Sequence, residues 1–259
     1  MGNEGKRTYV SALRDSQARQ TRRQIVAAAG RLFAEQGFAA TTVDAIAAEA
    51  GVSRKTVFTS VGGKVALLKL AYDFAMAGDD QPIPMIQREG LQAIIAEPDP
   101  HQQMRMYAEF VTGMGERISA LWLALRGAAE VDDEARQLYI RWEQERLDGM
   151  RAGPVRDLLA KDAIRPDLTP DEAAVVFWVL VDPVLYHRFV VEAGWSRERF
   201  RDWLHEAFQT QILVPCPTPA GAVVGVRHSA GDPASHPPAT TGTRAFRLCR
   251  PMPGEDGPR

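Results

Sequence analysis

The stretch from Thr42 to Val61, TVDAIAAEAGVSRKTVFTSV, constrains the fold more than any other part of the sequence. It predicts two short helices joined by a tight turn. Gly51 stands where the chain must reverse, and glycine adopts a positive φ there at no steric cost. Ser53 is a good N-cap for the second helix. The inner side of the pair is apolar, through Ile46, Val52 and Val57.

The second helix of this pair has a polar outer side. It carries two cations, three hydroxyls and an aromatic ring, at Arg54, Lys55, Thr56, Phe58, Thr59 and Ser60. In a helix-turn-helix the second helix lies in the major groove, where such side chains meet base edges and phosphates. The alternative for this stretch alone is an ordinary helical hairpin with a solvated face, because short motifs also occur by chance.

The flanking segments favour the helix-turn-helix. Before it, TRRQIVAAAGRLFAEQGFAATT places an apolar stripe on one side of a helix that Gly37 ends. After it, Gly62-Gly63-Lys64 leads into a new amphipathic run, VALLKLAYDFA. This order of elements resembles the TetR (tetracycline-repressor) family of bacterial transcription regulators. The resemblance is specific over residues 19–79 and looser beyond them.

The resemblance implies a set of DNA contacts. Thr42 would cap the first helix of the motif while its backbone N–H faces a phosphate. Lys64, at the start of the next helix, matches the family's phosphate-contacting lysine. Positions that touch DNA in relatives match Thr56, Phe58, Thr59 and Ser60.

The chain departs from the family pattern on the reading helix. The family usually has tyrosine where Phe58 stands, so a phosphate-binding hydroxyl is missing, and often an aromatic residue where Ser60 stands. Gly62-Gly63 replaces a more usual Pro-Ser-like turn. By their own chemistry, Arg54 and Lys55 are the best candidates for guanine or phosphate contacts, and simple solvation is the alternative for each.

The distribution of charge agrees with a DNA-binding head. The net charge is −2, but residues 1–77 carry 11 Lys and Arg against 6 Asp and Glu, whereas the remainder carries 20 against 27. A basic head on an acidic body suits a nucleic-acid-binding module, although chance clustering is an alternative. A nonspecific architectural DNA-binding protein would be basic throughout, so the acidic body argues against that class.

Other motifs are absent from the sequence. No GxSxG, GxGxxG, P-loop or HExxH motif occurs, so we expect neither a helical enzyme nor a catalytic residue. The two cysteines, Cys216 and Cys249, and the scattered histidines predict no metal site and no cofactor. We expect no membrane span, because no apolar run of about 18 residues stands out, and no signal peptide, so the expected location is the cytoplasm.

We expect an all-α chain with a helix-turn-helix head and a larger helical effector and dimerisation domain. Residues 1–18 are predicted to form a flexible basic arm, ahead of a helix from about Gln17 to Gln36. The head covers residues 19–79, with the motif at 42–61, and Asp79 to Pro84 breaks the chain. The helical body covers 83–214. Residues 215–259 have 9 prolines and 6 glycines, which predicts a disordered tail.

The body contains apolar helical stripes whose role the residues alone leave open. In the resembling family, apolar ligands bind among the middle helices, which implies a small, largely apolar effector. The candidate wall residues are Met104, Tyr107, Phe110, Met114, Trp122, Trp142, Phe177 and Trp178. Such a stripe is more often ordinary core than pocket.

The last part of the body indicates self-association. Thr169-Pro170-Asp171-Glu172 is a strong helix start, and Pro183 should interrupt the apolar segment that follows. This segment and the final helix after Ser196 have more apolar surface than one subunit needs, unless they only close the subunit's own core. In the resembling family the corresponding pair forms a twofold interface. We therefore expect a homodimer on a palindromic operator that acts as a repressor.

Overall fold

The computed structural model describes residues 4–81 and 83–215, and over these ranges the all-α prediction is confirmed. Within these ranges, β pairing is limited to an isolated bridge between Ile164 and Leu213. The predicted disordered tail and both cysteines lie outside the described residues, except for Pro215. In chain order the elements are α1 (Glu4–Ala40), α2 (Val43–Glu49), α3 (Arg54–Ser60), α4 (Lys64–Ala77), the 3-10 turn η1 (Met85–Gln87), α5 (Glu89–Ala96), α6 (Pro100–Ala129), α7 (Asp133–Met150), the π-helical turn η2 (Arg151–Val155), α8 (Arg156–Ala160), α9 (Pro170–Leu180), α10 (Pro183–Tyr186), the π-helical turn η3 (His187–Glu192) and α11 (Arg197–Gln211).

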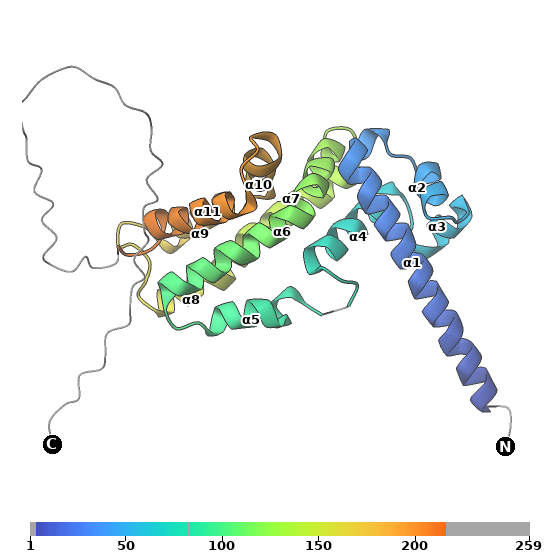
Figure 1. The fold of residues 1–259 in the computed structure, drawn as a ribbon, viewed down its shortest axis with the longest axis horizontal. Coiled ribbons are helices and arrows are strands. Elements are labelled where there is room, and N and C mark those ends of the chain that lie inside the picture. Colours follow the sequence, from blue (N-terminus) through green and yellow to red (C-terminus); the bar gives the residue numbers. More distant parts are fainter. Residues whose placement is uncertain (1–3, 82, 216–259) are drawn as a thin grey trace, which may run out of the picture. The chain divides into compact units, whose positions relative to one another are not determined.

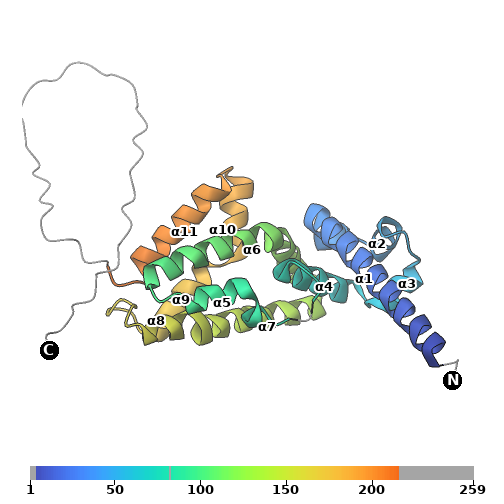
Figure 2. The ribbon, with the colours of Figure 1, turned by 60° about the horizontal axis from the view of Figure 1, so that its bottom comes forward.

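The helix-turn-helix has the N-caps and the glycine turn that the sequence predicts. The Thr42 hydroxyl accepts a hydrogen bond from the Ala45 amide at 3.0 Å, and the Ser53 hydroxyl accepts one from the Thr56 amide at 3.1 Å. Both residues are N-caps, which satisfy amides that have no partner within the helix. Gly51 between the helices has a φ of 66°. In both views α2 and α3 lie beside α1, on the side away from α6 (Figures 1 and 2).

The first helix is longer than predicted. It begins at Glu4 rather than near Gln17, so residues 4–18 are helical in the segment where the sequence predicts an arm. No proline interrupts the chain here, and residues such as Ala, Leu, Gln and Arg favour a helix. The helix kinks at Gly37, which has a φ of 73°.

A buried threonine closes the end of α1. Thr41 is fully buried, and its hydroxyl donates to the carbonyl oxygens of Leu32 at 3.1 Å and Gly37 at 2.8 Å. These carbonyls belong to the last turns of the helix, where partners within the helix run out. Thr41 therefore ends α1 and places Thr42 for its role as cap.

Helix α4 packs the head against the body. Its apolar side contributes Leu67 and Leu68 to a core shared with α1, and both side chains are fully buried. Farther along, the Tyr72 ring lies 4.4 Å from the Trp142 ring and 5.7 Å from the Trp122 ring, between centroids. The hydrophobic core of the head is therefore continuous with that of α6 and α7.

A second hydrophobic core lies in the other part of the body. Helices α6, α9 and α11 bring together Phe177, Phe200 and Phe208, which are buried almost completely. The predicted helix start at Thr169 is confirmed as a capping box with Glu172, and the chain turns at Val181 and Asp182 before Pro183, as predicted.

One segment contradicts the expectation that no run could span a membrane. Residues Pro170–Glu192 are long and apolar enough by length and composition: their most apolar 18-residue window has a mean hydropathy of 1.6, and 33% of that window is buried. The segment is not one straight helix, because it is divided into α9, α10 and η3. Because little of this segment is buried, apolar side chains on it are exposed to solvent.

The contact between α6 and α10 depends on a residue without a side chain. A Cβ atom added to Gly115 would lie 2.8 Å from both Cβ and Cγ of Tyr186. These atoms are close to the backbone of a buried residue and cannot move aside easily.

We predict that Gly115→Ala lowers the free energy of unfolding by about 1–3 kcal/mol, because the methyl group overpacks this contact. Chemical denaturation measures the change. Gly113→Ala on the same helix is the control, since its methyl group would meet only the ends of Arg197 and Arg117, at 3.6 and 3.8 Å. It should preserve or slightly raise stability, by up to about 1 kcal/mol. Equal effects of the two substitutions would contradict the packing argument.

Candidate DNA-binding surface and effector cavity

The reading helix α3 turns one apolar side inward and its polar side to solvent. Val57 is fully buried against the head core. Lys55 and Thr59 are exposed, and the ring of Phe58 is 44% exposed. A phenyl ring with this much exposed surface is available for contact with DNA.

Arg54 is held in position on this surface. Its guanidinium lies 2.5 Å from the Asp44 carboxylate of α2, measured from Nη1 to Oδ2, and its Cζ lies 5.5 Å from the centroid of the Phe58 ring. Sequence reasoning missed Asp44, because no helical spacing links two residues on different helices. The pair orients Arg54 and reduces the charge that it can offer to a phosphate.

The hydroxyls of α3 differ in how far they are engaged. Thr56 and Ser53 share a hydrogen bond of 2.8 Å between their hydroxyls, and Thr59 donates to the Lys55 carbonyl at 3.0 Å. The hydroxyls of Thr56 and Thr59 each retain the capacity to accept a further hydrogen bond. Ser60 is half-buried at the end of the helix.

Lys64, the first residue of α4, lies against the head. Its Nζ is 4.1 Å from the centroid of the Phe38 ring, a cation–π contact. Burial lowers the pKa of Lys64, and the charge of Asp132 partly opposes this effect. To contact a phosphate, the ammonium group would have to turn away from the Phe38 ring or contact the ring and the phosphate at the same time.

The body contains an apolar cavity of about 350 Å³. Its wall is formed by α4, η1, α5, α6, α7 and η2. Four of the eight predicted wall residues line it: Met104, Tyr107, Phe110 and Met114.

The other four predicted wall residues lie elsewhere. Trp122 is fully buried and stacks on Trp142, with ring centroids 6.3 Å apart. Phe177 packs against Phe208 in the second core, at 5.3 Å between centroids. The indole of Trp178 donates to Glu143 at 3.0 Å. These rings belong to the hydrophobic cores or to side-chain hydrogen bonds. The prediction placed them on the cavity wall because helical spacing alone does not separate a core stripe from a cavity wall.

Several wall residues were missed. Tyr72 and Met76 come from α4, which the sequence assigns to the head, and Ile86 and Ile94 come from η1 and α5, which it does not predict. Arg146 also lines the wall. The apolar residues of 83–96 were the available signal for an additional short helix.

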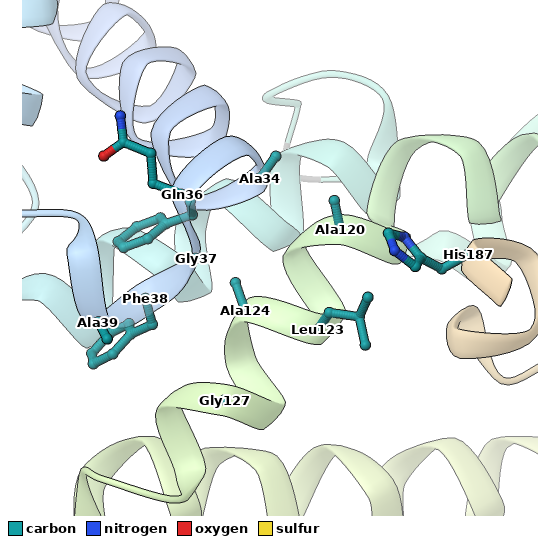
Figure 3. Close-up of a pocket in the computed structure, with 11 residues that line it drawn as sticks. Ala34, Gln36, Gly37, Phe38, Ala39, Ala120, Leu123, Ala124, Gly127 and His187 are labelled. Atoms are coloured by element: carbon teal, nitrogen blue, oxygen red, sulfur yellow. The ribbon is translucent and has the colours of Figure 1, made fainter. Parts of the chain in front are cut away.

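A second hollow, of about 330 Å³, lies between the end of α1 and α6. Figure 3 shows Phe38 and Ala39 on one side, Ala120 and Ala124 on α6, and His187 reaching in from η3. Its lining is mostly small side chains, with few polar groups that could bind a ligand. The hollow leaves space between head and body.

Comparison with known proteins identifies the head. Residues 25–71 match the family model described as bacterial regulatory proteins, tetR family. The match covers the helix-turn-helix, so the head of this chain is similar to the DNA-binding domain of TetR-family regulators. No curated protein sequence gives a significant match.

Solved structures share the fold of this chain at low sequence identity. A fatty acid degradation regulator FadR from Bacillus halodurans has a TM-score of 0.58 and 16% identity, over 72% of this chain and 93% of that one. A TetR-family regulator from Rhodococcus sp. has 0.56 and 20%, over 73% and 97%. A regulator from Saccharomonospora viridis in complex with choline has 0.55 and 20%, over 75% and 98%. They share its helical head and larger helical domain.

Metal-ligating side chains do not cluster in the part of the chain described here. No three His, Cys, Asp or Glu side chains come together within residues 4–81 and 83–215 as metal binding would require.

We predict that Phe58→Tyr changes the free energy of unfolding by less than about 0.5 kcal/mol, because the added hydroxyl reaches water. It should raise DNA affinity by roughly 0.5–1.5 kcal/mol if a phosphate accepts the new hydrogen bond. Phe33→Tyr is the control, since Phe33 is fully buried and an unpartnered hydroxyl there costs about 1–3 kcal/mol. Thermal melting and DNA titration of both variants separate the cases. A similar loss of stability in both would remove Phe58 from the DNA surface.

Proposed function

We propose that this protein is a homodimeric, operator-specific transcriptional repressor in the cytoplasm, released from DNA by a small, largely apolar effector. The observation that carries the proposal is the position of α4. This helix follows the reading helix directly and also contributes Tyr72 and Met76 to the wall of the apolar cavity. A ligand in the cavity therefore touches the element that joins the cavity to the DNA-binding head.

The DNA contacts are proposed to divide into two kinds. Arg54, held between Asp44 and Phe58, has a restricted orientation that suits hydrogen bonds to one base edge. Lys64, at the N-terminus of α4, suits a phosphate. Thr42, Lys55, Thr56, Thr59 and Ser60 complete the proposed surface.

The exposed side of α9 supports the homodimer. Val175 and Val179 are 44% and 49% exposed and lie one helical turn apart, on the segment that is so poorly buried. An apolar stripe of this kind is stable in water when a second copy covers it, and two copies would present two reading helices to a palindromic site. A membrane is the alternative cover. The charged side chains of Asp182 and Arg188 within the segment make that alternative costly.

The route from cavity to head is proposed to use the end of α4. Arg117 of α6 donates to the carbonyl oxygen of Ala75 at 2.8 Å, and Arg23 of α1 is paired with Asp80 just after α4. The end of α4 is therefore tied to both α6 and α1. A ligand that displaces Met76 would shift these contacts, and the hollow below α1 leaves space for the head to move.

The neighbours by fold do not identify the effector. The Saccharomonospora viridis protein was solved with choline, and the Bacillus halodurans protein is named for fatty acid degradation. These are different chemistries on one fold, so the effector has to be inferred from the residues of this cavity.

The decisive experiment is a mobility-shift titration with the DNA upstream of the protein's own gene, with and without excess random competitor. We expect a discrete complex that survives the competitor. A complex that random DNA removes in proportion to its concentration would favour a nonspecific DNA-binding protein, and no complex at all would favour another class, such as an enzyme.

We predict that Lys64→Ala weakens binding to all DNA sequences alike and reduces the slope of log Kd against log salt by about one per subunit, the effect of one lost phosphate contact. Lys69→Ala is the control. It removes the same charge from the same helix, but Lys69 is paired with Asp73 at 2.6 Å, and its loss should leave the slope nearly unchanged.

Arg54→Ala should behave differently. We expect a cost on the order of 1–3 kcal/mol per half-site on the operator, with relaxed preference at one base pair and little loss on random DNA. Titrations of operator, single-position variants and random duplex measure this. Equal losses on all of them would make Arg54 a backbone contact.

We predict that Val179→Glu converts the dimer to a monomer, because a carboxylate buried in an apolar interface costs several kcal/mol. Sedimentation measures the assembly, and operator affinity should fall with it. Ile140→Glu is the matched control, since Ile140 of α7 is 53% exposed and lies outside the proposed interface. A Val179→Glu variant that remains dimeric would exclude this side of α9 as the contact.

A further inference from the structure

Two tyrosine hydroxyls at the cavity lack strong hydrogen-bond partners. Tyr72 and Tyr107 line the cavity and are otherwise buried, with 5% and 7% of their surface exposed. The Tyr107 hydroxyl donates to the sulfur of Met150 at 3.7 Å, and sulfur is a weak acceptor. Within the described ranges, no hydrogen bond engages the Tyr72 hydroxyl. Both hydroxyls can therefore donate to an acceptor that enters the cavity.

A cationic side chain lines the same cavity. Arg146 lines the cavity, and only 14% of its side chain is exposed. Its Nη1 donates to Glu143 at 2.6 Å and its Nη2 to the Trp178 carbonyl at 3.1 Å, which leaves other N–H donors of the guanidinium.

The titration of the tyrosines agrees with this geometry. Burial raises the pKa of Tyr107 to about 12, and it also raises the pKa of Tyr72. The positive charge of Arg146 acts on the pKa of both groups in the opposite direction. Both hydroxyls therefore remain protonated donors at neutral pH.

The carboxylate on the wall is already neutralised. Asp157 accepts a hydrogen bond from Gln103 and pairs with Lys161 at 3.2 Å. Glu143 is not part of the wall. Arg146 is likewise paired with Glu143, so the wall offers a ligand the two tyrosine hydroxyls and the remaining N–H donors of Arg146, which suit an anion and disfavour a quaternary ammonium.

The remaining wall is apolar and limits the size of the ligand. Methionine and isoleucine are its most frequent residue types, for example Met76, Met114 and Ile118. A water-sized group occupies about 30 Å³ in a liquid, so a cavity of about 350 Å³ accommodates on the order of ten non-hydrogen atoms.

We propose that the effector of this protein is a small apolar carboxylate, whose carboxylate group accepts hydrogen bonds from Tyr72, Tyr107 and Arg146 while its apolar part fills the rest of the cavity. The inference rests on the proposed function, in which this cavity is the effector site. Because Tyr72 belongs to α4, the bound carboxylate contacts the helix that leads to the head.

Isothermal titration calorimetry of the full chain, without DNA, tests the ligand class. The probes are octanoate, 1-octanol and octyltrimethylammonium, which share one apolar chain and differ in the polar end. We expect octanoate to bind about tenfold or more tighter than either of the others, as hydrogen bonds to a charged group imply.

The tyrosine variants test the assigned residues. Tyr72→Phe and Tyr107→Phe each remove one oxygen atom and leave the pair of Arg146 with Glu143 intact. Each should weaken octanoate binding by about tenfold and 1-octanol binding by about threefold or less. Tyr186→Phe is the matched control, a buried tyrosine outside the cavity wall that should leave octanoate binding unchanged.

Several outcomes would overturn the proposal: equal affinity for octanoate and 1-octanol, tighter binding of the ammonium, tyrosine variants that bind octanoate like the wild type, or no binding of any probe. Failure here is distinct from failure of the proposed function. A protein that retains its operator but ignores octanoate refutes the carboxylate alone, whereas one that binds octanoate but retains no specific DNA refutes the regulator.

Discussion

The packing of Tyr72 against Trp122 and Trp142 holds the two parts of the molecule together. These rings come from α4, α6 and α7, so they join the core of the head to the core of the body. Aromatic pairs of this kind contribute about 0.5–1.5 kcal/mol each beyond the area that they bury. A displacement of α4 relative to α6 would break several such contacts at once. For this reason the head is expected to move with α4 in discrete steps rather than independently of the body.

The charged groups serve orientation more than stability. Arg54 and Asp44 are both more than half exposed, and such a surface pair contributes at most about 1 kcal/mol. Its effect is to hold a long side chain in one place before DNA arrives. Arg146 and Glu143 differ, because both are largely buried and Glu143 also accepts hydrogen bonds from Tyr139 and Trp178. Removal of either partner would leave a buried charge, which makes this pair costly to change.

Features that depend on neighbouring residues were predictable from sequence. Thr42, Ser53 and Thr169 act as caps because a cap needs only a side-chain oxygen and the next few amides. Gly51 is similar, since a positive φ is a local requirement. The α1 extension was missed because the sequence carries no signal that distinguishes a basic helix from a basic arm.

Features that depend on contacts distant in sequence were not predictable. Met104, Tyr107, Phe110 and Met114 share a cavity wall because η1, α5 and η2 come together opposite α6. Trp122 has the same helical spacing and composition around it, yet it is fully buried in the aromatic cluster. The role of Asp44 likewise depends on how α2 crosses α3. These contacts depend on distances between helices, which a single sequence does not specify.

The burial of Trp122 gives the protein an optical property. The indole is shielded from water, Trp142 stacks on it, and the Cζ atom of Arg146 lies 5.1 Å from its ring centroid. Excitation shifts charge across an indole ring, so its emission energy depends on the electric field of a nearby cation. A ligand that displaces Arg146 is therefore expected to shift the emission wavelength of Trp122, so that this tryptophan serves as an intrinsic probe of the cavity.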